Sequence, residues 1–119
     1  MDLCLVGSEM CIRDRIKAGL NFREFAEQSW KLPDNCYDNH YPCIIHGVGL
    51  CDEWPFVAYP NKDFSNSDYS AHFEENMTIC VESYIGEVGG KEGIKLEDQF
   101  LVTKDGLKQL SSFPYEYLN

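Results

Sequence analysis

The sequence predicts one α+β domain in which helices pack against a mostly antiparallel β-sheet. Two apolar segments with alternating side chains, at 77–85 and 94–103, predict neighbouring strands joined by a glycine-rich turn. An amphipathic segment that begins near residue 22 predicts a helix with one apolar face. A chain of 119 residues has room for one such domain and not for two.

The first predicted element is a helix from residue 22 to about residue 31. Asn21 can cap its first turn, and Glu24, three residues later, completes a capping box. Leu20 and Phe25 have the spacing of a hydrophobic staple. Pro33 stops the helix because proline disfavours helical backbone in the residue before it. The face expected to pack on the sheet consists of Phe22, Phe25, Ala26 and Ser29.

Two loops and one strand are predicted between this helix and residue 76. Residues 33–40 are rich in Pro, Asp and Asn, which predicts a loop. Residues 41–50 are apolar with two glycines, which predicts a strand that runs into a tight turn. Residues 60–76 are polar and predict a long surface loop of the kind that is often functional.

The second half of the chain predicts a hairpin followed by a short strand. The connection at 86–93 is interpreted as a plain hairpin turn, because its glycines lack the spacing of a phosphate-binding loop. The strand at 94–103 is followed by a turn at 104–106 and a strand at 107–110. Alternation in 77–85 places Cys80, Glu82 and Tyr84 on one face, and Ile79, Val81 and Ile85 on the other.

Composition excludes some classes of partner. Ten basic residues against twenty acidic ones give a formal charge of −10, so binding to nucleic acid is not expected. The apolar stretches are far shorter than a bilayer requires, so no membrane association is expected. The six cysteines have no zinc-finger spacing, and the N-terminus lacks the pattern of a secretory signal. We therefore expect reduced thiols and a cytoplasmic location.

The first fifteen residues are expected to be foreign to the domain. Residues 5–15 resemble one reading frame of a sequencing-library transposase adapter, and they carry no capping or turn pattern that leads into the next segment. We therefore expect residues 1–15 to be an artefactual segment and residues 16–119 to form the domain.

Three polar residues interrupt apolar strands: His46, Glu82 and Glu97. A buried, unpaired carboxylate is destabilised by several kcal/mol, so such a residue needs a partner or a metal. Taken singly, each is more often a solvent-facing or satisfied polar group than a ligand. Taken together, one imidazole and two carboxylates suit a divalent metal such as iron, manganese or zinc.

These residues lie in motifs that resemble the pita-bread metallopeptidase superfamily, which includes aminopeptidase P, prolidase, methionine aminopeptidase and creatinase. The motifs are residues 46–49, Glu82 within its strand, and 93–98 followed by 102–106, in the order of that superfamily. The resemblance covers residues 16–119. It implies the C-terminal part of a pita-bread catalytic domain, with a truncated, curved, mostly antiparallel sheet and packed helices.

The resemblance implies that His46, Glu82 and Glu97 are metal ligands. The remaining ligands of the superfamily are aspartates on strands that would precede Ile16. Asp34 and Asp38 lie in a predicted loop and are poor substitutes for them. The chain as given is therefore expected to hold an incomplete metal site and to be inactive.

One position departs from the peptidase pattern. Peptidases of this superfamily usually carry a second histidine seven residues after the first, and here that residue is Glu53. An anion at this place would oppose the oxyanion that develops during amide hydrolysis. The departure argues against peptide hydrolysis.

The run 49–55, together with Tyr41 and the segment 81–87, is most similar to the DddP-type dimethylsulfoniopropionate lyases, which are pita-bread proteins. This resemblance implies iron as the metal and a homodimer for the full-length protein. It implies a small-molecule substrate that is cleaved into dimethyl sulfide and acrylate by proton abstraction and β-elimination.

Within this resemblance, Asp52 is the expected base for the α-proton. Trp54 and Tyr41 are expected to offer aromatic faces to the sulfonium, and Tyr41 to hold the metal or the substrate. Asp52 is nearly as well explained as a turn cap, and Trp54 as a core residue. Two other functions stay open: an Xaa-Pro metallopeptidase of the aminopeptidase P or prolidase type, and a metal-free binding module on the same fold.

Overall fold

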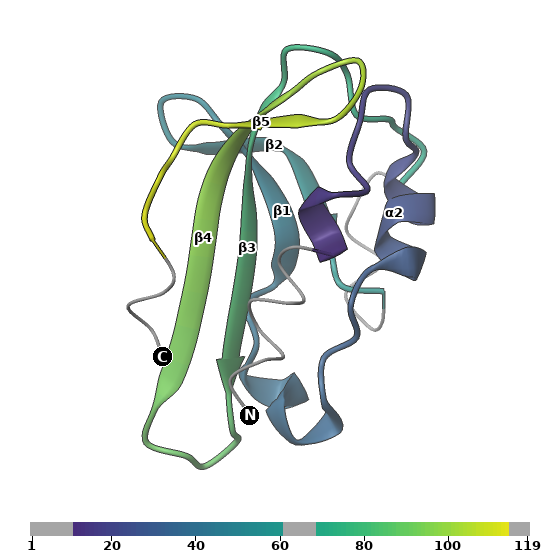
Figure 1. Cartoon of the computed structure of the whole chain (residues 1–119). Coiled ribbons are helices and arrows are strands. Elements are labelled where there is room, and N and C mark those ends of the chain that lie inside the picture. The colour runs from purple at the N-terminus through teal and green to yellow at the C-terminus, as the bar shows by residue number, and fades with distance from the viewer. Residues whose placement is uncertain (1–10, 61–68, 115–119) are drawn as a thin grey trace.

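A computed structural model describes residues 11–60 and 69–114, which form a five-stranded antiparallel sheet with helices on one side (Figure 1). The strand order is β2-β1-β3-β4-β5. In chain order the elements are α2 (Phe22–Gln28), the 3₁₀ helix η1 (Asp34–Asn39), β1 (Cys43–Val48), β2 (Asp52–Ala58), β3 (Thr78–Gly86), β4 (Gly93–Val102) and β5 (Leu107–Gln109). This architecture confirms the predicted α+β class with a curved, mostly antiparallel sheet.

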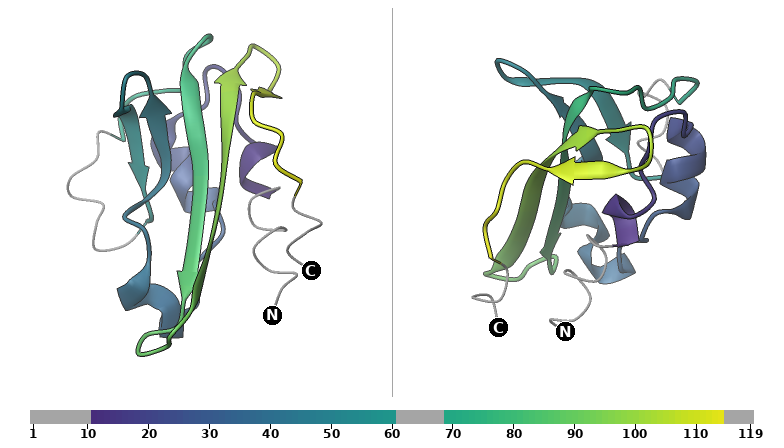
Figure 2. Two further views of the ribbon diagram at one scale, coloured as in Figure 1. Left: turned by 90° about the vertical axis from the view of Figure 1, so that its left-hand side faces the viewer. Right: turned by 45° about the horizontal axis from the view of Figure 1, so that its top comes forward.

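The core lies between the sheet and the segments packed on one of its faces (Figure 2). Phe73 holds α2 in place: its ring lies 4.7 Å from that of Phe22 and 5.5 Å from that of Phe25, both edge-on. The strands contribute Ile45, Val57, Ile79, Val81, Phe100 and Val102 to the same cluster. Alternation along each strand then sends the intervening side chains to the opposite face of the sheet.

Helix α2 begins as predicted and ends earlier than predicted. The Asn21 side chain accepts hydrogen bonds from the backbone N–H groups of Arg23 and Glu24, at 2.9 and 3.3 Å. The predicted end near residue 31 is wrong: Gln28 is the last helical residue. Ser29 ends the helix because its hydroxyl donates to Phe25 O and its N–H to Ala26 O.

The apolar face of α2 is the predicted one, since Phe22, Phe25, Ala26 and Ser29 are all buried. Only half of the predicted capping box is seen. Glu24 Oε1 lies 3.5 Å from Gln28 Nε2, one turn along the helix.

Residues 33–40 are not the loop that their composition suggested. Residues Asp34–Asn39 form η1, and Cys36 N–H donates to Pro33 O at 2.9 Å in the tight pattern of a 3₁₀ helix. Burial of Cys36 stabilises this turn against the domain. Of the predicted loop at 60–76, residues 61–68 lie outside the described residues.

Strand β2 was not predicted, and it contains Pro55, a residue that the interior strands of a sheet exclude. The register explains how the proline fits. His46 pairs with Phe56, and Gly47 pairs with Glu53, so Trp54 and Pro55 form a bulge on an edge strand. Edge strands and bulges are the places where a sheet tolerates proline.

The predicted hairpin in the second half is confirmed. Strands β3 and β4 pair from Thr78–Leu101 to Gly86–Gly93, and Gly89 adopts a φ of +78° in the connecting turn. The turn at 104–106 leads into β5, which ends at Gln109.

The segment before α2 also contacts the core. Ile12 and Ile16 are buried in the main cluster, with exposed fractions of 0% and 1%. The adapter-like origin of residues 1–15 therefore stays a prediction about where these residues come from. The structure shows that Ile12 fits the apolar space beside the sheet.

Two smaller findings bear on the predicted environment. The cysteines among the described residues, Cys11, Cys36, Cys43, Cys51 and Cys80, are all free thiols, and three of them are buried. Among the helices that the structure describes, none combines the length and apolarity needed to cross a bilayer.

Replacing Gly47 with alanine is expected to destabilise the edge of the sheet next to His46. A Cβ on Gly47 would lie 2.1 Å from the carbonyl oxygen of Trp54, which is backbone and cannot rotate away. We expect Gly47→Ala to lower the free energy of unfolding by roughly 2 kcal/mol in urea denaturation. Gly106→Ala, where a Cβ meets nothing within 4 Å, is the matched control. Equal stability of the two variants would contradict the proposed clash.

Candidate metal centre

Strand register brings the ligand-type residues together on the face of the sheet opposite α2. Glu82 of β3 lies directly across from Glu97 of β4, and His46 of β1 lies across from Cys80 of β3. Two carboxylates in directly opposed positions repel each other. A positive charge on this face of the sheet would therefore stabilise the pair of carboxylates.

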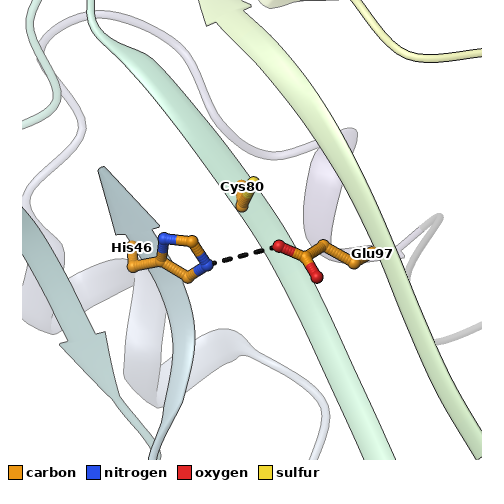
Figure 3. A group of neighbouring side chains, drawn as sticks. All are labelled: His46, Cys80 and Glu97. Atoms are coloured by element: carbon orange, nitrogen blue, oxygen red, sulfur yellow. Dashed lines mark ion pairs between the residues drawn. The ribbon is translucent and has the colours of Figure 1, made fainter. Parts of the chain in front are cut away.

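The imidazole of His46 points between the two carboxylates. Its Nε2 lies 3.3 Å from Glu82 Oε2 and 3.4 Å from Glu97 Oε1. Figure 3 shows His46 and Glu97 facing each other from neighbouring parts of the sheet, with Cys80 beside them. The structure thus places the three residues singled out in the sequence at one point, and their role as metal ligands stays a prediction.

The other nitrogen of His46 fixes which side of the ring can bind a cation. His46 Nδ1 lies 3.1 Å from the carbonyl oxygen of Gly47 and 3.6 Å from Asp52 Oδ1. A carbonyl only accepts, so we assign the proton to Nδ1 from this network. Nε2 then faces the two carboxylates, and it is the ring atom through which His46 would bind a metal. Metal-binding histidines in proteins are commonly oriented in this way by a carbonyl or carboxylate behind the ring.

Glu82 is the most constrained member of the cluster. Its side chain is fully buried, Oε1 lies 2.7 Å from Lys95 Nζ, and Oε2 lies 3.3 Å from His46 Nε2. Burial raises the pKa of Glu82, against the opposing effect of Lys95. A buried carboxylate next to an imidazole nitrogen is a donor set that fits a divalent metal.

Glu97 is more exposed and behaves differently. Burial alone would raise its pKa, but hydrogen bonds from Cys80 and Lys95 outweigh this effect and lower it. Glu97 therefore presents a charged carboxylate to His46 at ordinary pH.

Cys80 was not singled out as a site residue. Its Sγ lies within 4.8 Å of the ligand atoms of His46 and Glu97. Burial raises the pKa of the Cys80 thiol to about 12, so the thiol is neutral. The signal was present in the sequence, since alternation places Cys80 on the same face of its strand as Glu82.

A cavity of about 270 Å³ opens beside His46. Tyr41, Asp52 and Trp54 all line it, so the structure brings the predicted base and the two predicted aromatic residues to one place. Its wall consists of Tyr41, Cys43, His46, Asp52, Glu53, Trp54 and Phe56.

The two predicted aromatic residues that line this cavity already have contacts within the domain. Trp54 is 55% exposed and lies with its ring 5.7 Å from that of Phe22, so it is not the core residue that the alternative interpretation required. The ammonium group of Lys95 lies 4.9 Å from the centre of the Tyr41 ring. The Lys95 ammonium thus already contacts the ring of Tyr41.

Glu53 takes a structural part in the β1–β2 turn. Its Oε1 accepts a hydrogen bond from the N–H of Leu50 at 3.2 Å, and its carboxylate closes over Gly49. The residue that replaces the peptidase histidine is thus held by the turn while it lines the cavity.

Divalent metal binding is expected to depend on His46. Isothermal titration of the chain with Mn²⁺ or Co²⁺ should give saturable binding, and His46→Ala should weaken that binding at least roughly tenfold. His72→Ala is the control, because His72 is exposed and lies beside Asn21. If the two variants bind equally well, His46 is not a ligand.

Comparison with known proteins agrees with this geometry. The model of metallopeptidase family M24 matches residues 1–104. The chain is 44% identical over 103 residues to the dimethylsulfoniopropionate lyase DddP of Roseovarius nubinhibens, and 42% identical to that of Roseobacter denitrificans. It is 34% identical over 85 residues to the Xaa-Pro dipeptidase of Pyrococcus horikoshii.

The chain covers only part of these relatives. The matches to the two lyases span 87% of this chain and 23% of each lyase, and the match to the dipeptidase spans 69% and 20%. Among solved structures, the Xaa-Pro dipeptidase from Bacillus anthracis superposes with a TM-score of 0.73 at 24% identity, over 93% of this chain and 30% of that one. The prolidase from Pyrococcus furiosus gives 0.73 at 22%, over 93% and 31%. These neighbours share the pita-bread fold, and the chain belongs to metallopeptidase family M24.

Proposed function

We propose that this chain is the C-terminal part of the catalytic domain of a longer carbon–sulfur lyase, which cleaves dimethylsulfoniopropionate into dimethyl sulfide and acrylate. The observation that carries the proposal is the cavity beside His46, which Asp52, Tyr41 and Trp54 all line. The similarity to the two DddP lyases supports it. The chain spans less than a quarter of those lyases, so the activity is proposed for the longer protein.

The substrate has a carboxylate at one end and a sulfonium cation at the other. A divalent metal held by His46, Glu82 and Glu97 would supply Lewis acidity toward the carboxylate end. The faces of Trp54 and Tyr41 suit the sulfonium, because aromatic rings attract cations. The negative charges of Asp52 and Glu53 line the same cavity and favour a cation there.

Asp52 is the proposed base. Its side chain is 74% exposed, and its carboxylate can accept the α-proton. The C–H electron pair then forms the carbon–carbon double bond of acrylate. The carbon–sulfur bond breaks with its electron pair on sulfur, which releases neutral dimethyl sulfide. The proton stays on Asp52 until solvent removes it.

The finer properties of the longer protein belong to the same proposal. Imidazole and carboxylate donors suit iron, manganese or zinc, and we propose iron. We propose that upstream aspartates complete the site, that residues 1–15 are not native to the protein, and that the isolated chain is inactive. We also propose a homodimer in the cytoplasm.

A second candidate is an Xaa-Pro metallopeptidase. The 34% identity to the dipeptidase of Pyrococcus horikoshii favours it, and Glu53 at the place of the peptidase histidine disfavours it. A proline-containing dipeptide with added Mn²⁺ separates the two activities in one assay. A metal-free binding module would be recognised by metal analysis of the longer protein, which would then contain no stoichiometric iron, manganese or zinc.

The longer protein, with its upstream region recovered from source DNA, should release dimethyl sulfide from dimethylsulfoniopropionate. We expect Asp52→Ala to abolish headspace dimethyl sulfide while the metal content persists. Loss of the metal as well would mean that Asp52 only orients His46 through Nδ1. Full activity of this variant would remove Asp52 from the mechanism. Glu53→Gln, which changes the neighbouring carboxylate, is the control for charge alone.

Trp54 is expected to contribute to substrate binding more than to turnover. Trp54→Leu removes the aromatic face and keeps an apolar side chain, so KM should rise roughly two- to thirtyfold with kcat little changed. The shift should disappear for a neutral sulfide analogue tested as an inhibitor. An unchanged KM would contradict the proposed contact with the sulfonium.

A further inference from the structure

In both Glu82 and Glu97, one carboxylate oxygen faces His46 and the other faces Lys95. One oxygen of each faces His46 Nε2: Glu82 Oε2 at 3.3 Å and Glu97 Oε1 at 3.4 Å. The other oxygen of each faces Lys95 Nζ: Glu82 Oε1 at 2.7 Å and Glu97 Oε2 at 3.2 Å. The ammonium group therefore bridges the two carboxylates on the side away from the imidazole.

The sheet explains why Lys95 reaches both partners. Lys95 lies two residues before Glu97 in β4, on the same face, and its register partner is Tyr84 of β3. Its ammonium also lies over the ring of Tyr41, 4.9 Å from the ring centre. Contacts on three sides hold the charge near one position, although 45% of the side chain is exposed.

We propose that Lys95 is a positioning residue of the metal centre, which holds the outer oxygen of Glu82 and of Glu97 so that the inner oxygen of each faces His46. This inference rests on the proposed metal centre. Without the ammonium, two directly opposed carboxylates repel, and each is expected to turn away from the other. With it, the oxygens nearest His46 keep the orientation that a divalent ion requires, as partners behind metal ligands commonly ensure.

The opposite role is competition, in which the ammonium and a divalent ion exclude each other. The two roles predict changes of opposite sign. If Lys95 positions the carboxylates, its removal weakens metal binding; if it competes, its removal strengthens metal binding.

Cobalt titration of the chain followed by visible absorption tests the sign. We expect Lys95→Met to weaken Co²⁺ binding about 10- to 100-fold and Lys95→Arg, which keeps the charge, to restore most of the affinity. Lys108→Met is the matched control, since Lys108 is an exposed lysine on the adjacent strand β5. Equal or tighter binding by Lys95→Met would overturn the proposal.

Urea unfolding in the absence of metal is a second, independent test of the contacts between Lys95 and the two carboxylates. In double-mutant cycles of Lys95→Met with Glu82→Gln and with Glu97→Gln, we expect non-additive shifts in the urea midpoint for both pairs. Additive shifts in both cycles would overturn the positioning role, even if the chain bound no Co²⁺ and the metal centre itself were wrong. Failure of the longer protein to release dimethyl sulfide would count against the proposed function alone, because neither readout uses that activity.

Discussion

The direct opposition of Glu82 and Glu97 across strands β3 and β4 is the constraint on which the rest of the site depends. Two negative charges on one face of an antiparallel pair are unfavourable, and one of them is fully buried. Two nitrogen-bearing side chains lie beside these carboxylates: His46 of β1 on one side and Lys95 of β4 on the other. The opposite face of the same strands carries Ile79, Val81, Phe100 and Val102 of the core, so burial on the helix side of the sheet supplies the stability that this arrangement requires.

Local patterns account for the parts of the fold that could be predicted. Alternation in 77–85 and 94–103 placed the β3–β4 hairpin, and Asn21 with Phe22 and Phe25 placed the start and the buried face of α2. Once the hairpin is known, its side-chain period of two puts Glu82 and Glu97 on one face. The joining of His46 to them needs a third strand in register, and only the motif resemblance anticipated that.

The errors have physical causes as well. Strand β2 was missed, and it contains a proline, which a strand tolerates at an edge or a bulge. The sequence alone does not reveal that this strand lies at an edge and contains a bulge. The predicted length of α2 overran because the side chain of Ser29 competes for the backbone of the last turn. Lys95 was not singled out in the sequence, since one of its two partners, Glu82, lies on the neighbouring strand and is distant in the sequence.

The bulge at Trp54 and Pro55 has a consequence for how this scaffold changes its chemistry. The carboxylates proposed as ligands belong to the β3–β4 hairpin, whereas Asp52, Glu53 and Trp54 belong to the β1–β2 hairpin at the edge of the sheet. The two hairpins meet where β1 pairs with β3, and the imidazole of His46 reaches from β1 toward Glu82 and Glu97. An irregular edge strand can exchange residues without disturbing the inner hairpin, because few backbone hydrogen bonds depend on it. In the proposed function, the base and an aromatic contact lie on the edge hairpin with His46, and the two ligand carboxylates lie on the inner hairpin. A change in the edge turn can therefore alter the reaction while the two carboxylates stay in place.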